Sequence, residues 1–284
     1  MIYDIVNVLS VFIYKTERGD IMIKVLVNGA GGRMGSEVVR AVIQEKDLQL
    51  VGAVDPKCEG QDIGEVIGLG KTGVLISRSL QDAFHEVTPD VVIDFTSPAV
   101  IYENAKTVLT SGIHMVIGTT GLTSGQRNEL AAIAEKNSAN CLIAPNFSLG
   151  AVLLMKVSAE ISRYLPNAEI IELHHNHKFD APSGTAKLTA EKMEEARILQ
   201  PEPDETKESI AGARGGKYKA IPIHSVRLPG YVAHQEVIFG GYGEILTLRH
   251  DSLDRKSFMP GVITACKKIM EKPGLVYGLE NYLD

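Results

Sequence analysis

The sequence contains few cysteines, no excess of positive charge and no long hydrophobic run. Its three cysteines, Cys58, Cys141 and Cys266, lie far apart without a CxxC or Cys/His pattern, which argues against a disulfide framework and a zinc-binding module. A reducing, cytoplasmic compartment is therefore expected. The net charge of -6 argues against nucleic acid as a partner, because phosphate binding needs a basic surface.

The hydrophobic segments are too short for a membrane span. The longest candidate for a targeting segment, Ile2 to Tyr14, falls short of the roughly 20 residues that a spanning helix needs. It contains Asp4 and lacks both a basic leading segment and a small-residue cleavage site, so neither a membrane partner nor a signal peptide is expected. With 44% hydrophobic and 23% charged residues, the chain has the composition of a globular protein. Its length of 284 residues indicates two domains, or one domain carrying an insertion.

Strands and helices alternate in the first half of the sequence. Strands are expected at 23–27, 48–54, 91–95, 114–117 and 141–144, and helices at 33–44, 100–109 and 124–136. Such alternation predicts βαβ units, and hence an α/β domain with a doubly wound parallel sheet of the Rossmann type over residues 22–145.

The pattern changes after Asn146. Helical stretches at 151–164 and from Ser183 onwards surround a strand at 168–173, and consecutive strands follow at 221–227, 231–239 and 244–250. Consecutive strands without helices predict an open, mixed sheet, so residues 146–253 are expected to form a second, α+β domain. A helical stretch at 254–270 is expected to lead residues 254–284 back to the first domain.

The clearest ligand motif is the glycine-rich string Gly29-Ala30-Gly31-Gly32-Arg33-Met34-Gly35 between a strand and a helix. Glycines allow a tight turn and the close approach of a pyrophosphate, and the N-terminus of the helix then faces that anion. The next strand ends beside Asp55, about where an acidic side chain binds the adenosine ribose of NADH. Lys57 offers an attraction for the 2′-phosphate of NADPH, so the choice between NADH and NADPH stays open.

Two further loops follow strands at the same edge of the predicted sheet. They are Gly118-Thr119-Thr120-Gly121 and Ala144-Pro145-Asn146-Phe147. Because parallel sheets bind ligands at the carboxyl ends of their strands, these loops are expected to line the nicotinamide pocket. The alternative is that both are ordinary turns.

The segment from Glu172 to Thr185 carries the most chemistry. It places three histidines and Lys178 within five positions, which is more polar side chains than packing explains. The string Pro-Ser-Gly-Thr that ends at Thr185 is typical of a helix start, whose N–H groups and hydroxyl bind a carboxylate. Together these features predict a site for a small anion with proton donors beside it.

Two alternatives compete for this segment: a zinc site and a solvated basic turn. Neighbouring residues of a strand face opposite sides, so His174 faces away from both His175 and His177 in an extended chain, and no metal is expected. His174 and Lys178 would lie about 13 Å apart on such a strand, at roughly 3.3 Å per residue. The chain must therefore bend, or the two side chains serve different ends of the substrate.

From Met22 onwards the chain resembles the 4-hydroxy-tetrahydrodipicolinate reductases, also called dihydrodipicolinate reductases, of bacterial and plant lysine and diaminopimelate biosynthesis. The motifs that carry the resemblance are Gly-Ala-Gly-Gly-Arg-Met-Gly at 29–35, Asp-Phe-Thr at 94–96, Gly-Thr-Thr-Gly at 118–121, Asn-Phe-Ser at 146–148, and the long string from Glu172 to Ala186. The resemblance implies reduction of a small dicarboxylate, 4-hydroxy-tetrahydrodipicolinate, to tetrahydrodipicolinate with NADH or NADPH. It also implies a homotetramer assembled through the sheet of the second domain.

The resemblance implies roles for individual residues as well. His174 would be the proton donor or acceptor and Lys178 a proton donor, while His175, Gly184 and Thr185 would hold the substrate carboxylates. The residues expected to hold the cofactor are Gly29, Ala30, Gly31, Gly32, Arg33, Met34, Asp55, Gly118, Thr119, Thr120, Ala144, Pro145, Asn146 and Phe147. If His174 and Lys178 do not donate the proton, His234, His250 and Arg227 are the next candidates.

Two other functions stay open at this point: a related amino-acid or sugar dehydrogenase with the same two-domain plan, and a catalytically silent dinucleotide-binding regulator. Turnover of aspartate or a polyol would indicate the first. The second would keep the glycine loop but lack a proton donor, so His174 and Lys178 argue against it. Residues 1–21 fit neither domain, and a translated leader and a genuine N-terminal strand or helix are both compatible with them.

Overall fold

The computed structural model describes residues 14–15 and 21–283, which form two compact units. The first unit holds the described residues up to Ala144 together with Val262–Gly278, and the second holds Pro145–Gly261 and the residues from Leu279. The domain boundaries expected from the sequence stay a prediction. The hypothesis of a leader falls largely on residues 1–13 and 16–20, which lie outside the described part of the chain.

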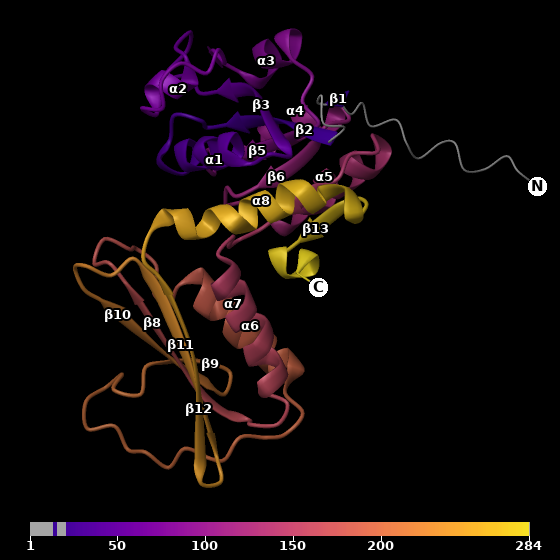
Figure 1. Cartoon of the computed structure of the whole chain (residues 1–284). Coiled ribbons are helices and arrows are strands. Elements are labelled where there is room, and N and C mark those ends of the chain that lie inside the picture. Colours follow the sequence, from indigo (N-terminus) through magenta and orange to yellow (C-terminus); the bar gives the residue numbers. More distant parts are fainter. Residues whose placement is uncertain (1–13, 16–20, 284) are drawn as a thin grey trace, which may run out of the picture. The chain divides into compact units, whose positions relative to one another are not determined.

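The first unit is built on a sheet of parallel strands with one short antiparallel addition. The strands are β1 (Tyr14–Lys15), β2 (Ile21–Asn28), β3 (Leu48–Val54), β4 (Ile76–Ser77), β5 (Val91–Asp94), β6 (His114–Ile117), β7 (Cys141–Ile143) and β13 (Leu275–Tyr277). Their order is β13-β7-β6-β5-β2-β3-β4, all parallel, and β1 pairs antiparallel with β2 (Figure 1).

The chain order reverses at the middle of this sheet. From β2 the chain runs outward through β3 and β4 on one side, and then through β5, β6 and β7 on the other. The expected Rossmann-type fold is thereby confirmed. Because ligands of such sheets bind where the order reverses, the carboxyl ends of β2 and β5 are the place to look for a cofactor site.

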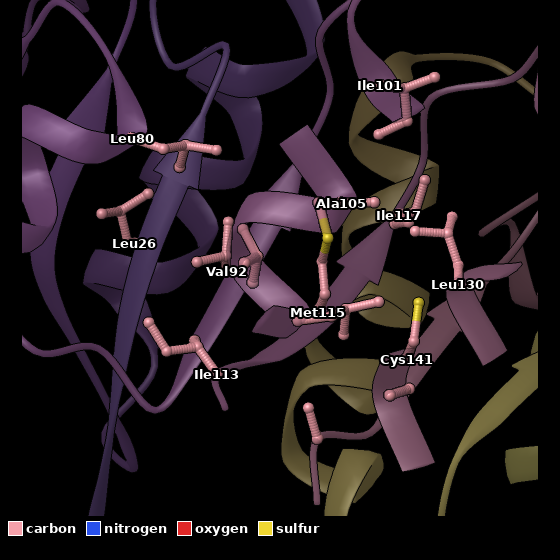
Figure 2. Close-up of a cluster of buried hydrophobic side chains, with 14 of the residues drawn as sticks. Leu26, Leu80, Val92, Ile101, Ala105, Ile113, Met115, Ile117, Leu130 and Cys141 are labelled. Carbon is pink, nitrogen blue, oxygen red and sulfur yellow. The ribbon is translucent and has the colours of Figure 1, made fainter. Parts of the chain in front are cut away.

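Helices cover the sheet and close its core. They are α1 (Arg33–Gln44), α2 (Ile63–Val66), α3 (Leu80–Glu86), α4 (Ile101–Thr110), α5 (Ser124–Lys136), the greater part of α8 (Met259–Lys268) and η2 (Ile269–Glu271). Every residue of β5 and β7 is buried, as expected for strands with helices on both faces. Figure 2 shows the resulting cluster, in which Val92 and Met115 of the strands lie among Ala105 and Leu130 of the helices.

The second unit contains a mixed sheet, as the sequence predicted. Its elements are α6 (Leu149–Ile161), β8 (Asn167–His174), α7 (Gly184–Ala196), β9 (Gly216–Tyr218), β10 (Ile221–Arg227), β11 (Ala233–Gly241), β12 (Glu244–Ser252), η1 (Arg255–Phe258) and η3 (Leu279–Tyr282). The strand order is β12-β11-β8-β10-β9, where β8 and β10 are parallel and the other neighbours antiparallel.

Helices α6 and α7 pack against the buried residues of this mixed sheet. Leu154 of α6 and Met193 of α7 join Ile170, Val237 and Phe239 of the strands in one hydrophobic cluster. The N–H of Ser183, which precedes α7, donates to Glu172 near the end of β8 at 3.2 Å, so the start of α7 lies beside the end of β8. Within the described residues, no helix is both long and apolar enough to cross a bilayer.

Candidate active site

The glycine loop of the first unit has the geometry of an anion cradle. Gly29 adopts a φ of +82°, and a Cβ there would lie 2.5 Å from the carbonyl oxygen of Phe95. A Cβ at Gly35 would overlap the backbone of Gly29. Helix α1 starts after Gly32 without any side-chain cap, so its first-turn N–H groups are available to an anion.

Asp55 is tied to this loop by its own carboxylate. It is buried, and it accepts hydrogen bonds from the backbone N–H of Gly31 at 3.1 Å and of Lys57 at 3.0 Å. The carboxylate therefore links the end of β3 to the glycine turn. Cys58 lies beside the same turn, since its Sγ would be 3.0 Å from a Cβ at Gly31.

A second buried carboxylate, Asp94, joins the strand ends at the point where the sheet order reverses. It is fully buried and accepts from the Asn28 side chain at 2.7 Å, from the Thr96 hydroxyl at 2.8 Å and from the Thr119 hydroxyl at 2.8 Å. The side chain of Asn104 adds a bond of 3.1 Å. These bonds fix the loops after β2, β5 and β6 relative to one another.

The loop after β6 packs closely on the loop after β5. A Cβ at Gly118 would run into the ring of Phe95, so only glycine fits there. The hydroxyl of Thr119 is already bonded to Asp94 and to the N–H of Thr96, whereas Thr120 is exposed. Of the two threonines, Thr120 is thus the one with a side chain open to a ligand.

In the second unit, His174 stands at the end of β8 with a buried carboxylate beside it. Its Nδ1 lies 2.5 Å from Oε2 of Glu172, whose side chain is fully buried, while the His174 side chain is 14% exposed. Arg227 meets the other side of the same carboxylate, with Nη2 2.6 Å from Oε1 and Nη1 2.8 Å from Oε2. Residues 172 and 174 share one face of β8, which brings the carboxylate to the imidazole.

Glu172 is an anion at neutral pH. Burial raises the pKa of this carboxyl, but hydrogen bonds from His174 and Arg227 outweigh it and hold the pKa at about 2. Arg227 lies opposite His174 in the parallel pairing of β8 with β10. The positive guanidinium therefore compensates a charge that burial alone would not tolerate.

The chain turns after His174, which is one of the two alternatives that the distance argument left open. β8 ends there, and the N–H of Lys178 donates to the carbonyl of His175 at 3.2 Å. The Lys178 ammonium pairs with Asp180 at 2.7 Å, and Arg227 donates to the carbonyl oxygen of Asp180 at 2.8 Å. The turn that carries Lys178 is thus fastened to the same arginine as Glu172.

Helix α7 begins with an anion-binding geometry. The Ser183 hydroxyl caps it by accepting from the N–H of Ala186 at 3.1 Å, which leaves the N–H groups of Gly184 and Thr185 in the first turn for an anion. A Cβ at Gly184 would meet nothing within 4 Å. The side chain of Asn146 donates to the Thr185 hydroxyl at 3.2 Å, so the hydroxyl proton is free to be donated in turn.

A small cavity inside the second unit connects several of these groups. Its lining includes Asn146, His174, Thr185, Gln235 and His250. His250 lies 3.0 Å from the Ser148 hydroxyl, and burial lowers the pKa of its ring. His174 and Thr185, predicted from one stretch of sequence, thus line one cavity.

Both family models that match this chain describe one enzyme. Residues 23–147 match "Dihydrodipicolinate reductase, N-terminus" and residues 150–283 match "Dihydrodipicolinate reductase, C-terminus". The chain belongs to the dihydrodipicolinate reductase family.

Individual relatives agree over nearly their whole length. The 4-hydroxy-tetrahydrodipicolinate reductase of Listeria monocytogenes serotype 4b is 51% identical over 263 residues, covering 92% of this chain and 100% of that protein. The reductase of Moorella thermoacetica is 49% identical, covering 92% of this chain and 98% of the relative. A solved structure, the dipicolinate-bound dihydrodipicolinate reductase from Paenisporosarcina sp. TG-14, is 43% identical with a TM-score of 0.81, covering 92% of this chain and 99% of that chain.

Within this family assignment, the structure gathers the predicted site residues in two groups. The glycine loop, Asp55 and the loop from Gly118 to Thr120 lie in the first unit, as does Ala144, while Pro145, Asn146 and Phe147 belong to the second. His174 and Thr185 line one cavity, Gly184 begins α7 and Lys178 lies in the turn after β8, whereas His175 is exposed. Among the described residues, no group of three or more His, Cys, Asp or Glu side chains is arranged to hold a metal ion.

Reasoning from the sequence did not assign roles to three groups of this dihydrodipicolinate reductase site. Glu172 was in the predicted segment, and its spacing of two from His174 on a strand was the available signal. Arg227 entered only as a substitute proton donor, yet both its terminal nitrogens bond Glu172. Asp94 was recognised only within a motif. His234, another substitute proton donor, pairs with a different carboxylate: its Nδ1 lies 2.7 Å from Oδ1 of Asp251.

Proposed function

We propose that this chain reduces 4-hydroxy-tetrahydrodipicolinate to tetrahydrodipicolinate, using NADH or NADPH, in lysine and diaminopimelate biosynthesis. In the reaction the hydroxyl leaves together with a ring hydrogen as water, and the ring gains a hydride from the cofactor and a proton. The observation that carries the proposal is the placement of His174, backed by an anionic carboxylate, beside the N-terminus of α7. One cyclic dicarboxylate can then contact both the proton donor, His174, and the anion site at the start of α7.

The start of α7 supplies the carboxylate-binding groups. The N–H groups of Gly184 and Thr185 donate to one carboxylate of the substrate. Asn146 occupies an acceptor position on the Thr185 hydroxyl, so that hydroxyl donates its proton to the same anion. His175, exposed beyond the end of β8, supplies a further donor.

His174 and Lys178 handle the proton. Nδ1 of His174 is held by Glu172, so Nε2 is the nitrogen that gives a proton to the developing enamine or takes one from it. Lys178, which pairs with Asp180 at 2.7 Å, is the second proton donor. Its position after the turn allows it to serve a different part of the ring from His174.

The first unit fits a dinucleotide. The turn at Gly29 leaves no room for a side chain, and the uncapped N-terminus of α1 offers N–H groups to a pyrophosphate. The residues that would hold the cofactor are Gly29 to Met34, Asp55, the loop from Gly118 to Thr120, and Ala144 to Phe147. When bound, the cofactor supplies the hydride.

The first test couples the purified protein to the condensation of pyruvate with aspartate semialdehyde by the upstream synthase. We expect nicotinamide absorbance to fall only when that system makes the cyclic dicarboxylate.

NADH should work at least as well as NADPH at low salt, because the Asp55 carboxylate disfavours a 2′-phosphate while Lys57 partly tolerates it. Folded protein without turnover of either cofactor would refute the proposal, and turnover of aspartate or a polyol instead would favour the related dehydrogenases.

We also propose that the second unit assembles a homotetramer in the cytoplasm. Ile245 of the edge strand β12 is 76% exposed and Tyr242 in the hairpin before it is fully exposed, so an apolar surface lies at an open sheet edge. Light scattering should give the mass of four chains, and Ile245→Asp should lower it. A wild-type monomer at micromolar concentration would contradict this.

The proposed cytoplasmic location is supported by the cysteines. Cys58, Cys141 and Cys266 are free, which is in keeping with a reducing compartment.

A further inference from the structure

The carboxylate of Glu172 is buried and held by partners from several elements of the second unit. It receives four hydrogen bonds, from His174 at 2.5 Å, from the two terminal nitrogens of Arg227 at 2.8 and 2.6 Å, and from the N–H of Ser183 at 3.2 Å. Each of its two oxygens accepts two of these bonds. The four donors together therefore fix the plane of the carboxylate.

An ionised carboxylate only accepts hydrogen bonds. Since Glu172 is ionised at neutral pH, the nitrogen facing it, Nδ1 of His174, must carry a hydrogen in the neutral imidazole and in the imidazolium alike. The second nitrogen, Nε2, is then the only one that exchanges a proton. The carboxylate also stabilises the imidazolium by its charge.

Arg227 stabilises this hydrogen bond between His174 and Glu172. Its guanidinium occupies both carboxylate oxygens, which keeps Glu172 from accepting the proton of His174 outright. The same side chain donates to the carbonyl oxygen of Asp180, the partner of Lys178. The orientation of His174 and the path of the turn that bears Lys178 therefore depend on one ion pair.

We infer that Glu172 is a positioning residue, which selects the His174 tautomer with hydrogen on Nδ1 and thereby directs Nε2 to the substrate. This inference rests on the function proposed above, in which His174 handles the proton. It goes further, because it assigns the direction of the imidazole to a buried carboxylate that touches no substrate.

Glu172→Gln tests the inference by reversing the tautomer. In the variant, the amide oxygen should stay at the Oε1 position, because Arg227 Nη2 and the Ser183 N–H can only donate there. At the Oε2 position one of the two partners, Nδ1 of His174, can change from donor to acceptor. The amide NH₂ then replaces Oε2 and donates to Nδ1 of His174, which moves the imidazole hydrogen to Nε2. We expect kcat to fall by about 100-fold or more, with the Kd for NADH changed less than about threefold.

The chain offers a matched control on the same strand. Glu169 of β8 also pairs with a histidine, His224 at 2.8 Å, and with an arginine, Arg214, but it lies away from His174. Glu169→Gln makes the same chemical change and should leave kcat within about threefold of wild type. If Glu172→Gln and Glu169→Gln lost kcat to a similar extent, both Glu–His–Arg clusters would matter only for the structure of the sheet, and the inference would be overturned.

Nitrogen-15 NMR of histidine-labelled full-length protein reads the tautomer directly, with the His174 signals assigned from His174→Gln. The wild type should show hydrogen on Nδ1 of His174 and Glu172→Gln hydrogen on Nε2. Hydrogen on Nε2 in the wild type, or a fall in kcat of less than about tenfold in a folded Glu172→Gln variant, would refute the inference. If that variant does not fold, the wild-type spectrum decides. A wild type that shows the expected tautomer but no turnover would instead refute the proposed function.

Discussion

Replacing His174 with glutamine is expected to lower kcat by about 10² to 10⁴, which is the usual contribution of general acid–base catalysis. Glutamine still donates a hydrogen bond to Glu172, so the buried carboxylate keeps a partner, but it has no nitrogen that exchanges a proton near neutral pH. Because His174 lies in the second unit and the glycine loop in the first, the Kd for NADH should stay close to that of wild type. Stopped-flow turnover and fluorescence titration with NADH measure the two quantities.

A contrasting variant, Thr185→Val, separates catalysis from substrate binding. It removes the hydroxyl that Asn146 orients and keeps a side chain of the same shape, so KM should rise while kcat changes little. If His174→Gln instead kept a near-normal kcat and lost NADH affinity, the segment from 172 to 185 would belong to the cofactor site. The proton donor would then have to be sought at His250 or His234.

Regular elements were the part of the fold that local sequence pattern predicted best. The helices α1 and α5 and the strands β3, β6 and β10 begin and end where the pattern placed them, because each has a distinct periodicity or a clear flanking signal. Thr123, for example, caps α5 together with Gln126. Of the tail expected to return to the first domain, Val262–Gly278 belong to the first unit, where β13 pairs with β7, and the residues before Val262 and from Leu279 belong to the second.

Short elements between Asp55 and Asp90 were not predicted. Helix α2 has four residues and β4 two, too few to show a period. Their positions depend on non-local bonds, chiefly those of buried Asp62, which accepts from the backbone of Gly64, Thr72 and Gly73. Hydrogen bonds of this kind lower the pKa of Asp62 to about 2, and no local pattern in the sequence announces them.

For the candidate site, the sequence predicted the residues that meet the ligand better than those that support them. His174, Lys178 and Thr185 stand in one string, so their types and spacing were visible at once. Arg227 lies 53 positions after His174 in the numbering and reaches Glu172 only because β10 pairs in parallel with β8. Asp94 likewise depends on the adjacency of β2, β5 and β6. Supporting contacts of this sort follow from the topology of the sheet.

Lys178→Ala is expected to lower kcat by about 10² to 10⁴ as well, because it removes a charged proton donor. The Lys178 side chain pairs with Asp180 at 2.7 Å, and the Asp180 side chain is 51% exposed. The hydrogen bond from Lys178 lowers the pKa of Asp180. Asp180→Asn keeps an oxygen acceptor for Lys178 and should cost less than about tenfold in kcat, since an exposed ion pair contributes little by itself. Steady-state kinetics in the coupled assay, together with NADH titration, compare the two variants. An equal loss of kcat in Lys178→Ala and Asp180→Asn would mean that the turn after β8 had lost its shape. A Lys178→Ala enzyme with normal kcat would show that no second group needs to deliver a proton, and would leave His174 as the sole proton donor.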